Sequence, residues 1–270
     1  MRFVEITGKM GFIFIGVLFA SPDLEAYVFI RSSQLYILCL FLGLSIYSLN
    51  SYFGYDNDLS NQRLSTIESY SKRGFRNSSI CFTIITLLIL CFFDWEVSVT
   101  AGLMILIWGI YASPNIGLKS IPILGLVVAF IAQLLHFHLG YLVFASVSVF
   151  SMVISIYFAL LFAAGHALHE VIDYEADKEA KLNTSAVYFG RQVLDYTSLF
   201  IFAAAAIYWT VIYHYHVINF VTWICYFAAF LLQLIAWVLY NKSQQFVYRR
   251  LYMVFYFVAT IIIILNSYWL

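Results

Sequence analysis

Long apolar segments alternate with shorter polar ones along almost the entire chain. A helix needs about 20 residues to cross a hydrocarbon core of about 30 Å, and most of these segments approach or exceed that length. They lie near residues 10–30, 34–53, 79–95, 97–113, 119–137, 140–166, 194–213, 217–240 and 250–269. The pattern predicts an all-α integral membrane protein in which about nine transmembrane helices form a single polytopic domain over residues 1–270.

The first segment permits a second interpretation. Arg2 and Lys9 precede an apolar run that reaches Ala20, so residues 1–22 also have the pattern of a signal peptide. Pro22 interrupts the segment at that point. Cleavage there would leave eight helices, whereas a chain that keeps this segment has nine. We predict nine helices.

The amino-acid composition supports a lipid environment. Hydrophobic residues make up 63% of the chain and charged residues 10%, against about 45–50% and about 25% in soluble globular proteins. So few charges cannot cover the apolar surface of a soluble protein of this size, and the high hydrophobicity excludes intrinsic disorder. Fourteen Lys and Arg residues balance 14 Asp and Glu residues, which gives no reason to expect a nucleic-acid partner.

The basic residues predict the orientation of the helices. With nine helices and the N-terminus in the cytoplasm, 13 of the 14 Lys and Arg residues fall on the cytoplasmic side, and Arg31 falls on the other. Cytoplasmic loops of membrane proteins carry such an excess of Lys and Arg. We therefore expect a cytoplasmic N-terminus in a multi-pass protein of the bacterial inner membrane.

Two of the cytoplasmic connections are long and polar, near residues 54–78 and 168–193. They follow the second and the sixth predicted helix and carry most of the acidic residues. Functional side chains are often carried by loops that a rigid scaffold positions. The sequence therefore predicts two halves, each of which presents an acidic motif at the same depth, with the active site on the cytoplasmic side.

The second acidic motif extends an apolar helix from His166 to Asp177. At about 100° per residue, five polar side chains share one face if the helix continues; they are His166, His169, Glu170, Asp173 and Asp177. Asp173 and Asp177 repel each other unless a cation lies between them, and carboxylates favour a hard cation such as Mg²⁺. The zinc pattern HExxH is absent because Asp173 stands in place of its second His. A solvated helix end is the alternative, but the cost of charge on a membrane helix favours function.

The first acidic motif consists of Asn50, Gly54, Asp56, Asn57 and Asp58. Asn50, Gly54 and Asp58 fall on one helical stripe, whereas Asp56 points about 200° away from Asp58. Both aspartates can share a site if the helix unwinds, which Gly54 and Asn57 favour. An ordinary helix exit is the alternative interpretation of such a run.

The two motifs and the nine-helix pattern together resemble the UbiA superfamily of intramembrane prenyltransferases. The family's second signature, DxxxD at the end of helix 6, is matched by Asp173 and Asp177, and residues 184–190 resemble the Thr/Ser-rich stretch that follows it. Residues 111–125 resemble the family's connector Tyr-Ser-x-Pro…Leu-Lys…Pro-x-Leu-Gly. The resemblance covers essentially the whole chain and implies a UbiA-like helical bundle.

The first signature departs from the family pattern NDxxDxxxD. Asn50 and Asp58 occupy its first and last positions, but Ser51 and Gly54 stand where its first two aspartates belong. Asp56 is an additional acid that could partly replace them. The number of bound metal ions and full catalytic activity are therefore open.

The resemblance implies Mg²⁺-dependent transfer of a prenyl group from a prenyl diphosphate to an aromatic or lipid acceptor within the membrane. It implies that Asp173 and Asp177 hold metal on one side of the diphosphate. It also implies that Asp58 holds metal on the other side, where Asn50 and Asp56 support both metal and substrate binding.

Two residues of the connector complete the expected site. Lys119 is expected to neutralise a phosphate oxygen, and Tyr111 is expected to donate a hydrogen bond to it. Lys119 then joins Asp58, Asp173 and Asp177 as the expected catalytic set.

Three other functions stay open. A UbiA-like terpene cyclase would ionise the same diphosphate without a separate acceptor. A catalytically weakened family member would bind lipid or act as a scaffold. A transporter would place ionisable residues near the bilayer midplane, whereas here they lie at helix ends, which disfavours transport.

Overall fold

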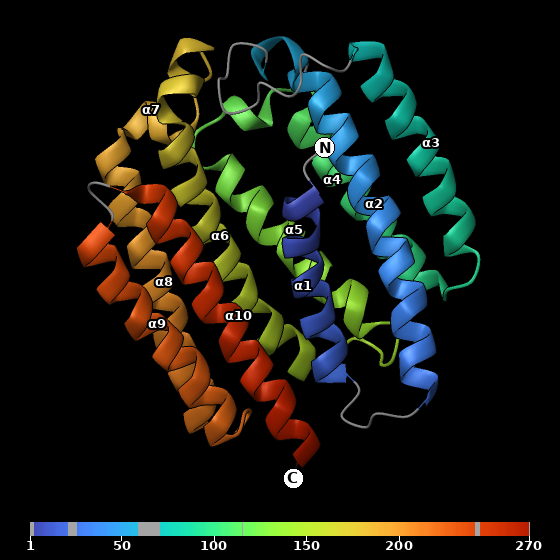
Figure 1. The fold of residues 1–270 in the computed structure, drawn as a ribbon, viewed down its shortest axis with the longest axis vertical. Coiled ribbons are helices and arrows are strands. Elements are labelled where there is room, and N and C mark those ends of the chain that lie inside the picture. Colours follow the sequence, from blue (N-terminus) through green and yellow to red (C-terminus); the bar gives the residue numbers. More distant parts are fainter. Residues whose placement is uncertain (1–2, 21–25, 59–70, 115, 241–243, 270) are drawn as a thin grey trace.

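The computed structural model describes residues 3–20, 26–58, 71–114, 116–240 and 244–269 (Figure 1). Within these ranges the structure is helical and contains no strand. The elements are α1 (Phe3–Ala20), α2 (Ala26–Asp58), α3 (Lys72–Leu90), α4 (Trp95–Ala112), the short 3₁₀ helix η2 (Leu118–Ser120), α5 (Leu124–Tyr141), α6 (Val149–Glu179), α7 (Ser185–Phe189), α8 (Arg191–His214), α9 (Phe220–Tyr240) and α10 (Gln245–Trp269).

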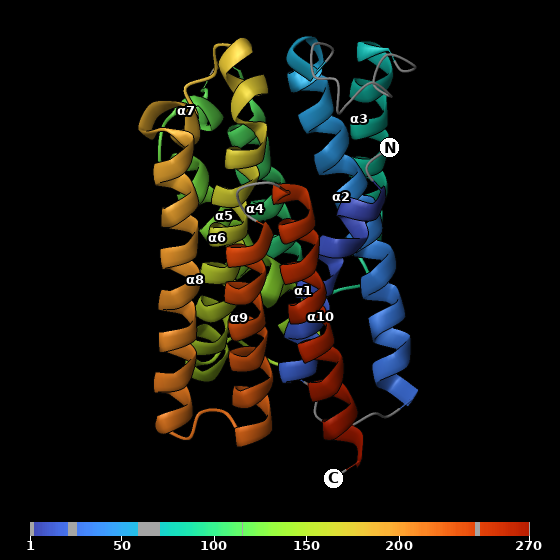
Figure 2. The same cartoon turned by 60° about the vertical axis from the view of Figure 1, so that its left-hand side comes forward.

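The predicted all-α membrane architecture is confirmed. Eight helices of the described chain, α2 to α6 and α8 to α10, are long and apolar enough to cross a membrane, and α1 adds the shorter apolar stretch Gly11–Ala20. Figure 2 shows the long helices side by side, roughly along a common axis. Helices satisfy all their backbone hydrogen bonds internally, as a lipid environment requires. The count of nine transmembrane helices and the cytoplasmic N-terminus remain predictions.

The apolar segment predicted at residues 10–30 contains parts of two helices. α1 ends at Ala20, and α2 already begins at Ala26. The sequence between them contains Pro22, and proline is strongly unfavourable in a helix interior. Hydropathy alone predicts one segment here, because the end of α1 and the start of α2 are both apolar.

α2 and α6 are longer than the hydrophobic pattern predicts. α2 reaches Asp58 and so covers the start of the connection predicted at 54–78, and α6 reaches Glu179 and so covers about half of the connection predicted at 168–193. Neither helix contains Pro, whose missing N–H group breaks helical hydrogen bonding. Ser148 and Ser151 form a capping box that begins α6, which satisfies two backbone donors of its first turn. Polar side chains therefore extend beyond the apolar span without ending the helix.

The helices form two groups that meet at α1, α5 and α6. α2 packs against α3 and α4, α4 against α5, and α5 against α6. Beyond α6 the order of neighbours is α8, α9 and α10. α1 packs mainly on α5 and also contacts α2 and α6, and Figure 1 shows it between the two groups.

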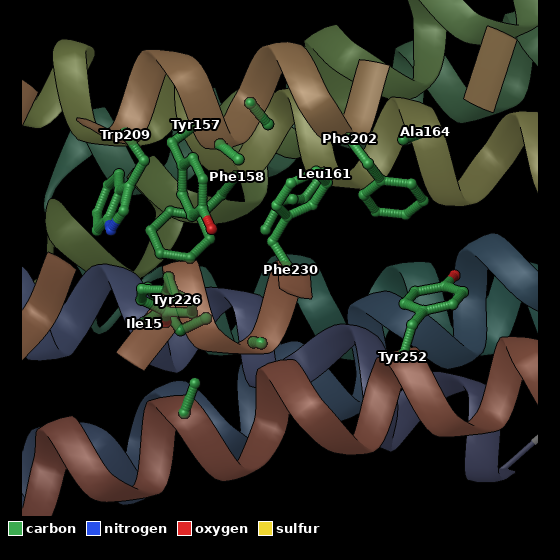
Figure 3. Close-up of a cluster of buried hydrophobic side chains, with 14 of the residues drawn as sticks. Ile15, Tyr157, Phe158, Leu161, Ala164, Phe202, Trp209, Tyr226, Phe230 and Tyr252 are labelled. Atoms are coloured by element: carbon green, nitrogen blue, oxygen red, sulfur yellow. The ribbon is translucent and has the colours of Figure 1, made fainter. Parts of the chain in front are cut away.

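Each group has its own buried core. Tyr157 and Trp209 stack with ring centroids 4.0 Å apart in the core of α6 to α10, and Tyr226 packs edge-on against Trp209 (Figure 3). The other core lies among α1, α2, α4 and α5 and includes Leu38 and Met104. Offset and edge-on aromatic contacts are favourable packing geometries. The two cores hold the helices on which the acidic motifs lie.

α1 and α5 approach each other at two glycines. A Cβ on Gly16 would overlap the backbone of Phe137, and a Cβ on Gly140 would overlap the backbone carbonyl of Ile13. Small residues permit this close contact between membrane helices, where van der Waals packing drives association. The crossing fixes α5, and therefore the connector that precedes α5, relative to α1.

Candidate functional site

The two acidic motifs lie at the same end of the bundle. α2 and α6 both run to the top of Figure 1, where their C-terminal ends carry the motifs. The short helix η2, which carries Lys119, lies at this end between α4 and α5. This arrangement places three polar segments from distant parts of the sequence around one end of the molecule.

The polar face predicted on α6 is built on a continuous helix. Because α6 runs without interruption to Glu179, the four residues that follow one another along this face are His166, Glu170, Asp173 and Asp177. Glu170 and Asp177 are buried, and His169 Nδ1 lies 3.2 Å from Asp173 Oδ2. The structure therefore places both aspartates of the DxxxD motif on one side of the helix end.

Glu170 connects α6 to α7. Its Oε2 atom accepts a hydrogen bond from the backbone N–H of Ala186 at 3.3 Å, and Ser185 also hydrogen-bonds to it. A carboxylate is well suited to accept the free N–H groups of a helix start. The acidic residue thereby holds the segment after the DxxxD motif against the motif itself.

Ser185 extends this connection to the start of α5. Its hydroxyl oxygen accepts a hydrogen bond from the backbone N–H of Ile123 at 3.1 Å. Ile123 has a φ of 72°, which is unfavourable for a β-branched residue and needs support from its surroundings. Ser185 supplies part of that support, so α5, α7 and α6 are tied together beside the motif.

Tyr111 and His166 join α4 to the same face. The Tyr111 hydroxyl lies 3.4 Å from His166 Nε2, and this nitrogen lies 3.6 Å from Glu170 Oε1. Tyr111 is buried. The family resemblance implies that this hydroxyl faces a phosphate; in the structure it lies beside His166, within the polar face of α6.

Gly125 lets α5 pack closely on this group. A Cβ at residue 125 would lie 2.8 Å from Glu170 Oε1 and 3.4 Å from His166 Nε2. The resemblance to the family connector includes this glycine, but no sequence pattern indicated which side chains it faces. Ser185 likewise lies in a segment that resembles the family, residues 184–190, but the sequence assigned it no function. Long-range contacts of this kind leave no periodic signal in the sequence.

The first motif does not unwind, contrary to the expectation from Gly54 and Asn57. α2 is helical through Asp58, because a single glycine costs a helix only about 1 kcal/mol and no proline follows. Asp56 is exposed and forms an ion pair with Lys72 of α3, at 2.5 Å between Oδ2 and Nζ. Asp56 therefore faces α3.

Three other residues predicted for the site are Asn50, Lys119 and Asp58, and the structure describes the side chains of the first two. Asn50 lies half-buried on α2, and Lys119 lies half-buried on η2. The side chain of Asp58 lies outside the part of the structure that is described. The structure thus joins Tyr111 to the α6 face and places Asn50 and Lys119 on elements at the same end.

The donor atoms of the α6 face fit a hard divalent cation. Asp173 and Asp177 offer carboxylate oxygens, which Mg²⁺ prefers. Among the described residues, however, no group of three or more His, Cys, Asp or Glu side chains is arranged to hold a metal ion. A bound ion would need further oxygen ligands, which the α2 motif or a phosphate group can supply.

Comparison with known proteins identifies the family of this chain and solved structures of similar fold. The profile of the UbiA prenyltransferase family matches residues 10–263. No curated protein matches. A UbiA homolog from Archaeoglobus fulgidus, in a structure bound to GPP and Mg²⁺, is 19% identical with a TM-score of 0.74, and the match covers 96% of each chain.

Two further solved structures have the same fold. The apo structure of a UbiA homolog from Aeropyrum pernix K1 is 13% identical with a TM-score of 0.79, over 98% of this chain and 99% of that one. A structure of digeranylgeranylglyceryl phosphate synthase is 17% identical with a TM-score of 0.66, over 97% of this chain and 92% of the other. The similarity extends over nearly the full length of all these chains.

Proposed function

The chain belongs to the UbiA prenyltransferase family, and from this premise we propose that it transfers a prenyl group from a prenyl diphosphate to an aromatic or lipid acceptor within the membrane. The observation that carries the proposal is the unbroken polar face of α6, with Asp173 and Asp177 at the end of the bundle where α2 also ends. The solved homolog bound to GPP and Mg²⁺ supports the same chemistry. We place the site on the cytoplasmic face of a bacterial inner membrane.

The carboxylates of Asp173 and Asp177 would hold Mg²⁺ from the α6 side, and Asp58 with Asn50 would hold it from the α2 side. When bound, Mg²⁺ neutralises negative charge on the diphosphate as the C–O bond breaks. Lys119 would pair with a phosphate oxygen at the same end.

The remaining residues of the site position these groups. Glu170 and Ser185 hold α7 and the start of α5 against α6. The Tyr111 hydroxyl, next to His166, would donate a hydrogen bond to a phosphate oxygen. Preorganised donors of this kind stabilise charge that develops on a leaving group. The apolar interior below them keeps water from the carbocation that forms.

One observation favours a second candidate, a family member with weakened catalysis that binds a prenyl lipid. Two aspartates of the first family signature are replaced by Ser51 and Gly54, and Asp56 is paired with Lys72. α2 then offers fewer carboxylates to a metal than α6 does. A terpene cyclase would use the same α6 face and differs only in the product.

The product distinguishes these functions. Membranes that contain the protein are incubated with prenyl diphosphates of increasing length, with Mg²⁺ or with EDTA, and with host lipid extract. Diphosphate release is measured, and extracted lipids are identified by mass spectrometry. Metal-dependent release with an acceptor adduct supports the transferase, release with a free terpene indicates a cyclase, and binding of the diphosphate without release indicates the weakened member.

A further inference from the structure

Arg250 lies on the outward face of α10, in line with apolar side chains. Phe246 lies one turn before it, Val254 one turn after it and Phe257 two turns after it, all within about 40° of Arg250 around the helix. Arg250 is exposed, and so are these three side chains, Phe246 to 52% and Phe257 to 64%. α10 is long and apolar enough to cross a membrane. This stripe therefore faces lipid and carries a cation near its beginning.

The protein supplies no counter-charge for Arg250 nearby. α10 packs mainly on α9, and neither of these helices contains Asp or Glu. Among the described residues, Arg250 forms no hydrogen bond and no ion pair. Cations on membrane helices normally pair with another group or extend to the membrane surface. The partner of this guanidinium therefore lies outside the chain.

Arg31 shows how the chain pairs an arginine at the same position of another membrane helix. Arg31 is the sixth residue of α2, as Arg250 is the sixth residue of α10. The Arg31 guanidinium donates to the Phe92 carbonyl at 3.1 Å and to Gln34 Oε1 at 3.3 Å, and it lies 3.9 Å from Asp94 Oδ2. The unpaired state of Arg250 is thus a local feature of α10.

The position of Arg250 along α10 places its charged group near the membrane surface. Its Cα lies about 8 Å along the helix axis from that of Gln245, the first residue of α10. Helical side chains tilt toward the N-terminus of their helix, and an extended arginine covers most of this distance. Residues 241–244, which precede α10, are polar. The guanidinium can therefore reach the boundary between the apolar stripe and this polar connection, where lipid phosphates lie.

A second arginine reaches the start of α10 from α8. Arg191 Nη2 donates to Gln245 Oε1 at 2.5 Å. The Gln245 amide is neutral, so this hydrogen bond brings a positive charge to the start of α10 without neutralising it. Basic groups gathered at the ends of membrane helices favour anionic lipid headgroups.

We propose that the outward face of α10 near its start binds an anionic phospholipid, with the phosphate on Arg250 and an acyl chain along Val254 and Phe257. A guanidinium can form two parallel hydrogen bonds to phosphate oxygens. A soluble phosphate would leave the apolar stripe uncovered, and the choline group of a zwitterionic lipid would add positive charge beside Arg191. The site is separate from the acidic face of α6, and the inference does not depend on the proposed function.

Two charge-matched variants test the inference. Full-length protein in detergent is titrated with phosphatidylglycerol or with phosphatidylcholine of the same acyl chains, and bound lipids are counted by native mass spectrometry. We expect the natural protein to bind the first phosphatidylglycerol at least about fivefold more tightly, the effect of about one surface charge. Arg250→Gln should reduce this preference to within about twofold. Arg73→Gln, which removes the same charge from the exposed start of α3, should keep it.

Two further measurements identify the ligand and check the fold. An excess of glycerol phosphate should not displace the lipid, because it has no acyl chain to cover the apolar stripe. Arg250→Gln should unfold at the temperature of the natural protein, because Arg250 is exposed and no partner among the described residues loses a bond.

Five results would overturn the inference. Three concern the lipid preference: its absence from the natural protein, its persistence in Arg250→Gln, or an equal loss in Arg73→Gln. Displacement of the lipid by glycerol phosphate would instead assign Arg250 to a soluble phosphate. A dimer whose abundance falls in Arg250→Gln, without any change in lipid binding, would assign this face of α10 to a second copy of the chain.

Discussion

The carboxylate of Glu170 on α6 lies directly against Gly125 on α5, with Oε1 2.8 Å from the point that a Cβ on residue 125 would occupy. The same carboxylate accepts a hydrogen bond from Ala186 at the start of α7. Only glycine at 125 leaves room for this arrangement. The closing glycine of the connector and the acid that precedes the DxxxD motif therefore form one structural unit.

Gly125→Ala should displace Glu170 from α7. The carboxylate is the end of a flexible side chain, so it moves and α5 stays in place, and the cost in stability should be only about 1 kcal/mol, the size of one hydrogen bond. Prenyl transfer should fall about tenfold, since the acidic face is no longer held. Initial rates of diphosphate release and thermal unfolding measure the two effects.

Gly102→Ala on α4 is the control for that change, because no atom lies within 4 Å of a Cβ built at residue 102. Both the rate and the unfolding temperature should match those of the natural protein. Equal rates for Gly125→Ala and Gly102→Ala would show that the contact with Glu170 has no part in activity.

Gly140→Ala should destabilise the whole bundle. The added Cβ would overlap the Ile13 carbonyl, and α1 and α5 must separate to relieve the overlap, at a cost of about 1–3 kcal/mol. The unfolding temperature in detergent should fall. Gly11→Ala lies on α1, the helix of Ile13, and has open space around its added Cβ, so it should have no such effect. An equal fall in both variants would contradict the close crossing.

Asp56→Asn should leave prenyl transfer within about twofold of the natural rate. Its carboxylate is exposed and paired with Lys72 of α3, and exposed ion pairs contribute little. The dependence of the rate on Mg²⁺ concentration should also be unchanged. A shift of that dependence to higher Mg²⁺ would instead assign Asp56 to the metal site, as the sequence alone suggested.

Gly54→Asp restores a carboxylate at a position where the family signature has one. Residue 54 lies on the same stripe of α2 as Asn50 and Asp58, and the helix is continuous there. The variant should keep its activity and reach half of its maximal rate at a lower Mg²⁺ concentration. Loss of all activity would show that this part of the site has been remodelled around the glycine.

The membrane fold could be predicted from the sequence because lipid imposes a simple rule. Apolar segments of sufficient length become helices, and the approximate position of each segment follows from its hydropathy. Helix ends were less predictable. α2 and α6 continue past their apolar segments to Asp58 and Glu179, since hydropathy reports where lipid contact ends and not where backbone hydrogen bonding ends.

The candidate site was predictable only where its residues share one helix. The spacing of His166, Glu170, Asp173 and Asp177 alone predicts that they share one face of a helix. Contacts between helices could not be found in this way. The pairing of Asp56 with Lys72 of α3 and the contact of Gly125 with Glu170 join helices that are distant in the sequence, and no local pattern indicates them.

We propose above that the polar face of α6 drives metal-dependent ionisation of a prenyl diphosphate. The most direct measurement compares Asp173→Asn with Glu175→Gln, which makes the same chemical change two residues away on the exposed, opposite side of α6. Mg²⁺-dependent diphosphate release is followed for both, after membrane insertion is verified. We expect Asp173→Asn to lower the release rate at least about 100-fold, equivalent to about 2.7 kcal/mol of barrier, and Glu175→Gln to stay within about twofold of the natural rate. Equal rates for the two variants would contradict it.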